Sequence, residues 1–466
     1  MGLFIVRHQH EPDHCPAGDP DLGGRLLTYL SRPSVRQLGI EVKGEAVVSG
    51  EHTLYLILEA ADAATVEGFL DPFRQAGTVE VLPASTCARV VASGGCAAPT
   101  PRLDDAVPAV DPEMATQDAI DAGLVVHRAH PLNCETSVPA LIGGVVMPNA
   151  RFYVRNHFQI PDLDAATWRL DVGGLVERPL RLSLADVERL PSSTLPVTLE
   201  CAGNGRSAMD PPVPGEQWRL GAVSTAEWTG VPLTEVLDRA GVRPTARAVV
   251  FRGADSGTVD GEPGTLRFER GLSLDDVRDC EALLAYAMNG EPLPVAHGFP
   301  VRLVVPGWYA VASVKWLTQI DVIDRPFAGY YQEARYQYEW EGDGNVEREP
   351  VRLQQVRALV TQPRPGDLVT GGEMVVRGVA WSGAAPVARV DVSVGDGPWR
   401  QATLVGERRR HSWRWWELVV PVEGTGATTF RARATDLAGR TQPEENAWNR
   451  LGYGGNAIQR VEVQLG

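Results

Sequence analysis

The chain has 466 residues, a length that corresponds to about three domains of roughly 150 residues each. Its 44% hydrophobic and 22% charged residues are typical of folded proteins and exclude global disorder. The formal net charge of −15 argues against nucleic acid or an anionic membrane surface as a partner, although it permits a local basic pocket for a small anion.

Residues 1–95 are predicted to form a small ferredoxin-like α+β domain, because strands and helices follow in the order β-α-β-β-α-β. The predicted strands are 3–8, 40–48, 53–59 and 78–82, and the predicted helices are 22–37 and a segment from an N-cap at Asp62 to Arg74. Residues 96–122 are rich in Ala, Pro, Gly and Asp without clear periodicity, so we expect a linker there.

The remaining chain is predicted to form two further domains. Residues 123–345 alternate short strands with helices, such as 231–240 before Gly241, and predict a mixed α/β domain. The other elements expected there are strands 168–172, 197–200 and 248–251 and a helix over 182–189. Residues 346–466 contain only short strands between Gly/Pro turns, which is typical of an immunoglobulin-like β-sandwich.

Cysteine content and hydropathy indicate the compartment. Six cysteines are too few for a disulfide framework, which favours a reducing environment. The opening segment MGLFIVRHQH reaches charged residues after a very short apolar run, unlike a secretory signal, and no run approaches the ~18 apolar residues of a membrane span. We therefore expect a cytoplasmic protein.

The strongest chemical signal is the segment TLECAGNGRS at 198–207. A strand delivers Cys201 into a turn of small residues that lets the backbone approach a bulky group, and Arg206 adds a permanent cation near the sulfur. A thiolate in such a turn suits a soft metal. Taken alone, the same pattern also fits a buried structural cysteine or a nucleophile with a histidine base.

Two further segments carry candidate anion-binding groups. In RFYVRNHFQIP (151–161), strand alternation would place Arg155 and His157 on the same side, where they could bind an anion together. The alternative is an edge strand whose polar face is solvated. Downstream, His297 and Arg302 flank a Gly-Phe-Pro turn, and Lys315 lies in an apolar, strand-like run where it needs a partner. A phosphate would suit these three side chains, although each could belong to an ordinary ion pair.

Together these stretches resemble the sulfite oxidase family of molybdenum–molybdopterin oxidoreductases. The resemblance rests on RNH, TLECAGNGRS, GAVSTAEWTGVPLTEVL, LLAYAMNGEPLP, HGFPVRLVVPG and SVKWL, in this order between residues 155 and 317. The C-terminal segments VRGVAWSG, ARVDVSV and WNRLG resemble the dimerisation domain of that family.

The resemblance implies a role for individual residues. Cys201 would be the protein ligand of molybdenum, and substrate would meet Arg155, Arg206, Trp218 and Tyr336. The residues implied to hold the molybdopterin are Asn156, His157, Asp255, His297, Arg302, Ser313, Val314 and Lys315. Two guanidinium groups that stay charged would bind and orient a small oxyanion.

The resemblance also implies oxidation of sulfite to sulfate by oxygen-atom transfer, in a homodimer. No CxxCH haem motif is present, so we expect no haem in this chain and an external electron acceptor such as a cytochrome or dioxygen. Two departures leave alternatives open. Gly205 replaces the first arginine of a family pair, and Arg450 is displaced by one position in WNRLG. A related reductase of nitrate or an S- or N-oxide, and a catalytically dead binding module, are the alternatives.

Overall fold

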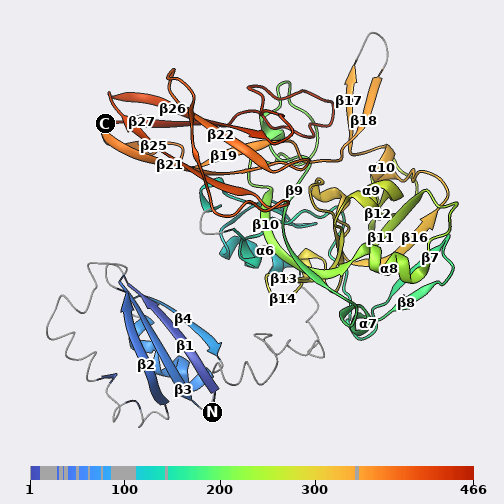
Figure 1. Cartoon of the computed structure of the whole chain (residues 1–466), viewed down its shortest axis with the longest axis horizontal. Coiled ribbons are helices and arrows are strands. Elements are labelled where there is room, and N and C mark those ends of the chain that lie inside the picture. Colours follow the sequence, from blue (N-terminus) through green and yellow to red (C-terminus); the bar gives the residue numbers. More distant parts are fainter. Residues whose placement is uncertain are drawn as a thin grey trace. The chain divides into compact units, whose positions relative to one another are not determined.

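A computed structural model describes residues 2–10, 29–30, 35, 40–48, 52–60, 63–74, 77–84, 112–141, 145–341 and 346–466. The chain divides into two compact units, Met1–Arg102 and Leu103–Gly466 (Figure 1). None of the helices in these described ranges is both long and apolar enough to cross a membrane.

The N-terminal unit contains a four-stranded antiparallel sheet with the order β2-β3-β1-β4. The strands are β1 (Gly2–Gln9), β2 (Ile40–Val48), β3 (Thr53–Ala60) and β4 (Thr78–Ala84). One face buries alternate apolar residues such as Val6, Leu56 and Leu58, and α3 (Ala63–Phe69) and α4 (Asp71–Arg74) contribute to the same core. This is the strand order of a ferredoxin-like fold. The expected helix 22–37 and the Asp62 cap fall on residues that the structure does not describe.

Residues 96–122 are not entirely a linker, because their last part forms helix α6 (Pro112–Asp121). The helix begins at a proline, which is favoured in a first helical turn, and Ala119 is buried in a small cluster with Leu124 and Leu132. It precedes the hairpin of β5 (Leu124–Arg128) and β6 (Asn133–Thr136). Tertiary packing of a weakly periodic segment thus produces a helix that composition did not predict.

Two sheets build the middle of the larger unit, the first antiparallel throughout and the second mixed because β16 and β7 run parallel. The first has the order β14-β13-β10-β9 with β15 paired to β13, and the second has the order β12-β11-β16-β7-β8. The strands of the first are β9 (Ser193–Glu200), β10 (Val223–Pro232), β13 (Leu283–Met288), β14 (Glu291–Pro292) and β15 (Arg302–Val304). Those of the second are β7 (Leu170–Gly174), β8 (Leu180–Leu182), β11 (Ala248–Gly257), β12 (Leu266–Ser273) and β16 (Leu317–Ile323).

Short helices cover these sheets where the sequence supplies clear caps. Helix α7 (Leu184–Glu188) begins with a capping box between Ser183 and Asp186, so it is shorter than the predicted 182–189. Helix α8 (Leu233–Ala240) ends at Gly241, whose φ of 72° is the left-handed conformation that a glycine cap adopts. Helices α9 (Leu274–Asp279) and α10 (Tyr330–Glu333) complete this region.

The C-terminal region is the predicted β-sandwich, preceded by the hairpin of β17 (Gln337–Glu341) and β18 (Val346–Pro350) (Figure 1). One sheet has the order β19-β21-β25-β24 and the other the order β20-β27-β26-β22-β23. Trp416, Val390 and Phe430 are buried in their common core. The strands are β19 (Arg357–Gln362), β20 (Leu368–Val369), β21 (Gly372–Trp381), β22 (Val387–Val394), β23 (Arg400–Gln401), β24 (Thr403–Val405), β25 (Arg414–Val422), β26 (Gly426–Asp436) and β27 (Arg460–Leu465).

Candidate functional site

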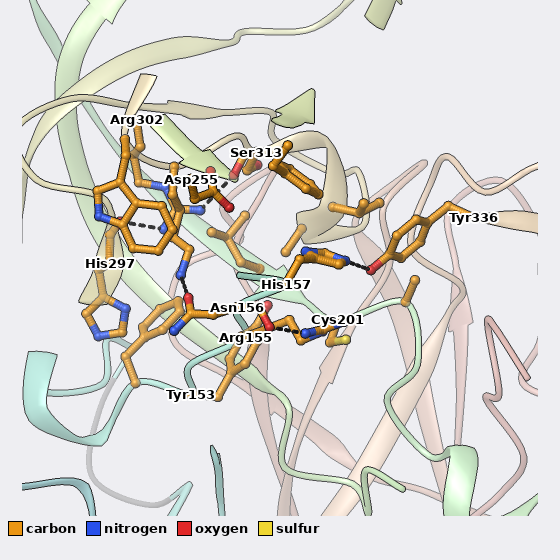
Figure 2. A pocket seen from close by; sticks show the side chains of 18 residues that line it. Tyr153, Arg155, Asn156, His157, Cys201, Asp255, His297, Arg302, Ser313 and Tyr336 are labelled. Atoms are coloured by element: carbon orange, nitrogen blue, oxygen red, sulfur yellow. Dashed lines mark hydrogen bonds between the residues drawn. The ribbon is translucent and has the colours of Figure 1, made fainter. Parts of the chain in front are cut away.

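A deep cavity lies within the larger unit and collects most of the predicted site residues. Figure 2 shows His297 and Arg302 toward one end of it and Cys201 and Tyr336 toward the other. Its lining includes Tyr153, Arg155, Asn156, His157, Cys201, Asp255, Phe268, His297, Arg302, Ser313, Lys315, Trp316 and Tyr336.

A second, wider cavity adjoins the first. The two share four lining residues: Arg155, His157, Cys201 and Tyr336. Cys201 therefore lies at the boundary between a deep cavity and an outer one. The outer lining is rich in guanidinium groups, from Arg128, Arg155, Arg206, Arg335 and Arg450.

The turn after β9 fixes the position of Cys201. Its backbone N–H donates to the carbonyl of Ala222 at 2.9 Å, and its carbonyl accepts from Asn204 N at 2.9 Å. Gly203 leaves room for the Arg206 guanidinium, because a Cβ would lie 2.5 Å from it. Burial raises the pKa of the Cys201 thiol, while the charges of Arg155 and Arg206 oppose that rise.

Arg155 and Arg206 are both anchored by the protein where they line the outer cavity. Arg206 Nε donates to the carbonyl of Leu451 at 3.0 Å and its Nη1 to that of Glu216 at 2.9 Å. Arg155 Nη1 donates to Asn133 Oδ1 at 3.2 Å. Such bonds to neutral acceptors hold each guanidinium without cancelling its charge, as anion binding requires.

The predicted strand around Arg155 does not form, which corrects the alternation expected for residues 151–161. Only an isolated bridge between Cys134 and Val154 is present. The backbone N–H of Asn156 donates to Asn133 Oδ1 at 2.8 Å instead of to a neighbouring strand. Arg155, Asn156 and His157 consequently all line the deep cavity, although alternation would have separated Asn156 from the other two.

Tyr336 and His157 meet at the boundary between the cavities. The Tyr336 hydroxyl lies 2.6 Å from His157 Nε2, as Figure 2 shows. Burial, followed by the charge of Arg155, holds the pKa of His157 well below its usual range, so its ring is neutral at neutral pH. Tyr336 has a φ of 56°, a conformation that non-glycine residues adopt at a cost and that is often found at functional sites.

The far end of the deep cavity gathers buried cationic side chains. Lys315 Nζ donates to the carbonyl of Ala296 at 2.9 Å and also to Asn156 Oδ1. Arg302 donates to the carbonyls of His297 at 2.9 Å and Ser313 at 3.1 Å. Burial lowers the pKa of Lys315 well below its usual range, that of Arg302 to about 10 and that of His297 to about 3. Such a cluster is costly without an anion and is suited to hold a phosphate.

Asp255 adds an acceptor that the described part of the chain leaves unsatisfied. Its Oδ1 is buried without a hydrogen-bond partner there, and burial raises its pKa to about 7 against the opposing charge of Lys315. A ligand with N–H donors, such as a pterin ring, would satisfy it. A soft sulfur ligand, an orphaned carboxylate and a cationic end together fit an anionic pterin that carries a metal.

Two of the predicted site residues line neither cavity, and the strand expected around Lys315 is absent. Trp218 lines neither cavity, because it is fully buried in the core that also contains Phe152 and Cys201. Val314 is likewise fully buried and lines neither of these cavities. Lys315 lies in a loop before β16 and not in a strand.

The structure also adds residues that the sequence did not single out. Arg128, Arg335 and Tyr453 line the outer cavity, and Phe268 lines the deep one. Tyr453 stacks on Tyr336 with 4.9 Å between ring centroids. The sequence shows aromatic residues in Gly- and Tyr-rich loops, but nothing in it assigns these residues to the site.

Comparison with known proteins agrees with this geometry. Residues 157–331 match the oxidoreductase molybdopterin binding domain and residues 348–466 match the Mo-co oxidoreductase dimerisation domain. Mitochondrial sulfite oxidase of Mus musculus is 37% identical over 79% of this chain and 70% of that protein. Nitrate reductase [NAD(P)H] of Hordeum vulgare is 34% identical over 78% of this chain and 45% of that protein.

Among solved structures, the sulfane dehydrogenase SoxCD of Paracoccus pantotrophus superposes with a TM-score of 0.63 at 29% identity. That match covers 71% of this chain and 84% of the other. The two domain matches and the relatives that span most of the chain establish its family. The chain belongs to the sulfite oxidase family of molybdopterin-dependent oxidoreductases.

Proposed function

We propose that this protein oxidises sulfite to sulfate at a molybdenum centre bound through Cys201. The observation that supports this most is the position of Cys201 between a deep cavity with a cationic end and an outer cavity rich in arginine. The deep cavity would hold the pterin, with its phosphate near His297, Arg302 and Lys315. When bound, the molybdenum cofactor supplies two-electron oxygen-atom exchange.

The residues of the chain would bind and orient the substrate. Arg155 and Arg206 converge on the outer cavity, where each offers a planar set of N–H donors. Their N–H groups would bind oxygen atoms of sulfite and leave its sulfur lone pair free to face the metal that Cys201 would hold. The contribution of these arginines is therefore positioning and charge stabilisation, and not proton transfer.

Tyr336 would complete the pocket at the boundary. Burial raises the pKa of its hydroxyl, so the group remains a neutral hydrogen-bonding partner. The 2.6 Å contact with neutral His157 fixes the orientation of the hydroxyl. The electrons would leave for an external acceptor, such as a cytochrome or dioxygen.

A sulfite-dependent assay tests the proposal. Purified protein loaded with molybdenum is expected to reduce ferricyanide or cytochrome c only when sulfite is added. Molybdenum-loaded protein that shows no sulfite-dependent reduction would refute sulfite as the substrate. Failure to retain molybdenum under any conditions would instead favour a binding module without activity.

Nitrate reduction is the second candidate, because the barley relative is a nitrate reductase. Nitrate is a planar monoanion, whereas fully deprotonated sulfite carries two negative charges and uses more of the positive charge around Cys201. The same preparation should be assayed for nitrate-dependent oxidation of a reduced dye. Activity with nitrate and none with sulfite would reverse the assignment.

We also propose a homodimer in the cytoplasm. The match of residues 348–466 to a dimerisation domain supports the dimer, and light scattering should give twice the 50.4 kDa of one chain. Three described cysteines, Cys134, Cys201 and Cys280, are unpaired, which supports a reducing compartment. Cell fractionation tests the location.

A further inference from the structure

The outer cavity is lined by five arginines, which differ in the groups that hold their guanidinium ends. Of the five arginines that line it, Arg155 and Arg206 are anchored on neutral acceptors. Arg128 pairs with Glu216 at 2.5 Å, so its charge is already balanced by a carboxylate in the same lining. The fourth and fifth, Arg335 and Arg450, differ sharply from each other.

Arg450 is committed to a carboxylate. Its Nε donates to Glu339, whose side chain is only 4% exposed, and the same carboxylate also lies 3.4 Å from Arg348. The hydrogen bond from Arg450 holds the pKa of Glu339 below its usual range, so the carboxylate is ionised at neutral pH. If Arg450 turned away to bind an anion, the buried Glu339 carboxylate would keep only its longer contact with Arg348. Arg450 is therefore a poor ligand for an incoming anion.

Arg335 has no such partner among the described residues, although Glu339 lies close enough for the Arg335 charge to lower its pKa. No carboxylate of the described residues forms an ion pair with it, and none of their acceptors takes a hydrogen bond from its guanidinium. Its guanidinium instead lies over the Tyr330 ring, 5.5 Å from the centroid, and both residues line the outer cavity. A guanidinium stacked in this way keeps its in-plane N–H donors available for an oxyanion.

The backbone fixes Arg335 close to the reacting end of the cavity. Its own N–H donates to the carbonyl of Tyr330 at 3.1 Å at the end of α10. The next residue is Tyr336, whose hydroxyl contacts His157 at the boundary between the two cavities. The left-handed backbone of Tyr336 turns the chain sharply here, and this turn brings both side chains to the same cavity.

We propose that Arg335 is a third anion-binding residue of the substrate pocket and that Arg450, which pairs with Glu339, does not take this role. The inference rests on the proposed oxidation of a small oxyanion at Cys201. Arg335 would bind the anion together with Arg155 and Arg206, and it would confer selectivity for a dianion over a monoanion.

The test compares Arg335→Gln and Arg335→Lys with the wild-type holoenzyme in two measurements. Calorimetric titration with sulfate measures anion binding without turnover, and steady-state kinetics with sulfite separates KM from kcat. Loss of one charge-assisted contact should weaken sulfate binding and raise KM by at least about tenfold in Arg335→Gln. The kcat value should stay within about threefold of the wild type. Arg335→Lys should have an intermediate sulfate affinity and KM, because lysine keeps the positive charge but lacks the paired N–H donors of the guanidinium.

Two further variants control the comparison. Arg352 also lies over an aromatic ring, that of Trp308 at 5.8 Å, but lines neither cavity, so Arg352→Gln should match the wild type. Arg450→Gln should affect sulfate binding less than Arg335→Gln does. The proposal is overturned if Arg335→Gln leaves both sulfate affinity and KM within about twofold of the wild type, or if Arg450→Gln has the larger effect.

The two measurements also separate this inference from the proposed function. If the wild type binds sulfate through Arg335 but never turns over sulfite, the anion site stands and sulfite oxidation fails. If the wild type oxidises sulfite while Arg335→Gln is unaffected, sulfite oxidation stands and the role of Arg335 fails.

Discussion

Glu200 and Arg357 form a fully buried ion pair, 3.1 Å between Oε1 and Nη1, that joins the residue before Cys201 to the first strand of the β-sandwich. The same carboxylate accepts from Asn204 Nδ2 at 3.0 Å and from Trp381 Nε1 at 2.8 Å. Gly205 leaves the necessary room, because a Cβ there would lie 2.8 Å from Arg357 Nη2. The sandwich therefore helps to hold the turn that carries the proposed metal ligand.

Arg357→Ala is predicted to lower the free energy of unfolding by about 3–5 kcal/mol, because it leaves the buried Glu200 carboxylate without its cation. Molybdenum content should fall with it, since the turn around Cys201 loses its support. Urea denaturation and elemental analysis measure the two effects. As a matched control, Arg377→Ala breaks a half-exposed pair with Glu417 and should cost at most about 1 kcal/mol. Equal losses in the two variants would contradict a special role for the buried pair.

Lys315→Met is predicted to separate stability from cofactor binding. Burial, and next the charge of Arg302, lowers the pKa of Lys315, so removing this group should leave the cofactor-free protein at least as stable as the wild type. Retention of the pterin should nevertheless fall, because its phosphate loses a cation. Melting temperature and pterin fluorescence after denaturation test this. A purely structural lysine would instead show a lower melting temperature with unchanged pterin content, and Lys43→Met should change neither.

His297 is predicted to make the cofactor-free protein less stable in acid. Burial lowers the pKa of His297 to about 3, whereas an unfolded chain binds the proton near 6.5, so stability falls as pH decreases from 6.5 toward 3. Between pH 7.5 and 5.5 this group alone should remove about 1.4 kcal/mol. Urea denaturation at the two pH values measures the free energy of unfolding of the wild type and of His297→Gln. The decrease between pH 7.5 and 5.5 should be smaller in the variant by that amount. An identical loss in both proteins would exclude His297 as its source.

Trp218→Phe is predicted to affect stability and not substrate binding. Trp218 is buried in the core, and its Nε1 has no hydrogen-bond partner among the described residues, so the change removes packing but no hydrogen bond. The free energy of unfolding should fall by about 1–3 kcal/mol, while KM for sulfite stays within about twofold. A tenfold rise in KM at unchanged stability would place Trp218 in the substrate pocket after all.

The parts of the site that lie in contiguous motifs could be predicted from the sequence. The turn around Cys201 combines one cysteine with small residues, and His297, Arg302 and Lys315 are charged groups in apolar surroundings that require a partner. These patterns reflect local constraints, and all four side chains line the deep cavity.

The residues that tertiary structure brings to the site could not be predicted in this way. Arg357 lies in the apolar segment VRALV, which signals a buried charge, but nothing local identifies Glu200 as its partner. Arg335 and Tyr453 come from loops whose position depends on packing. The strand expected around Arg155 failed because Asn133 binds the backbone of Asn156, a contact across 23 residues.

The most direct test of the central claim compares molybdenum-loaded wild type with Cys201→Ser in sulfite-dependent reduction of cytochrome c. The substitution keeps the size of the side chain but removes the soft thiolate that the metal requires. We predict turnover in the wild type, none in Cys201→Ser, and an altered absorption spectrum of the metal centre. Unchanged activity and spectrum in Cys201→Ser would contradict the assignment of Cys201 as the metal ligand.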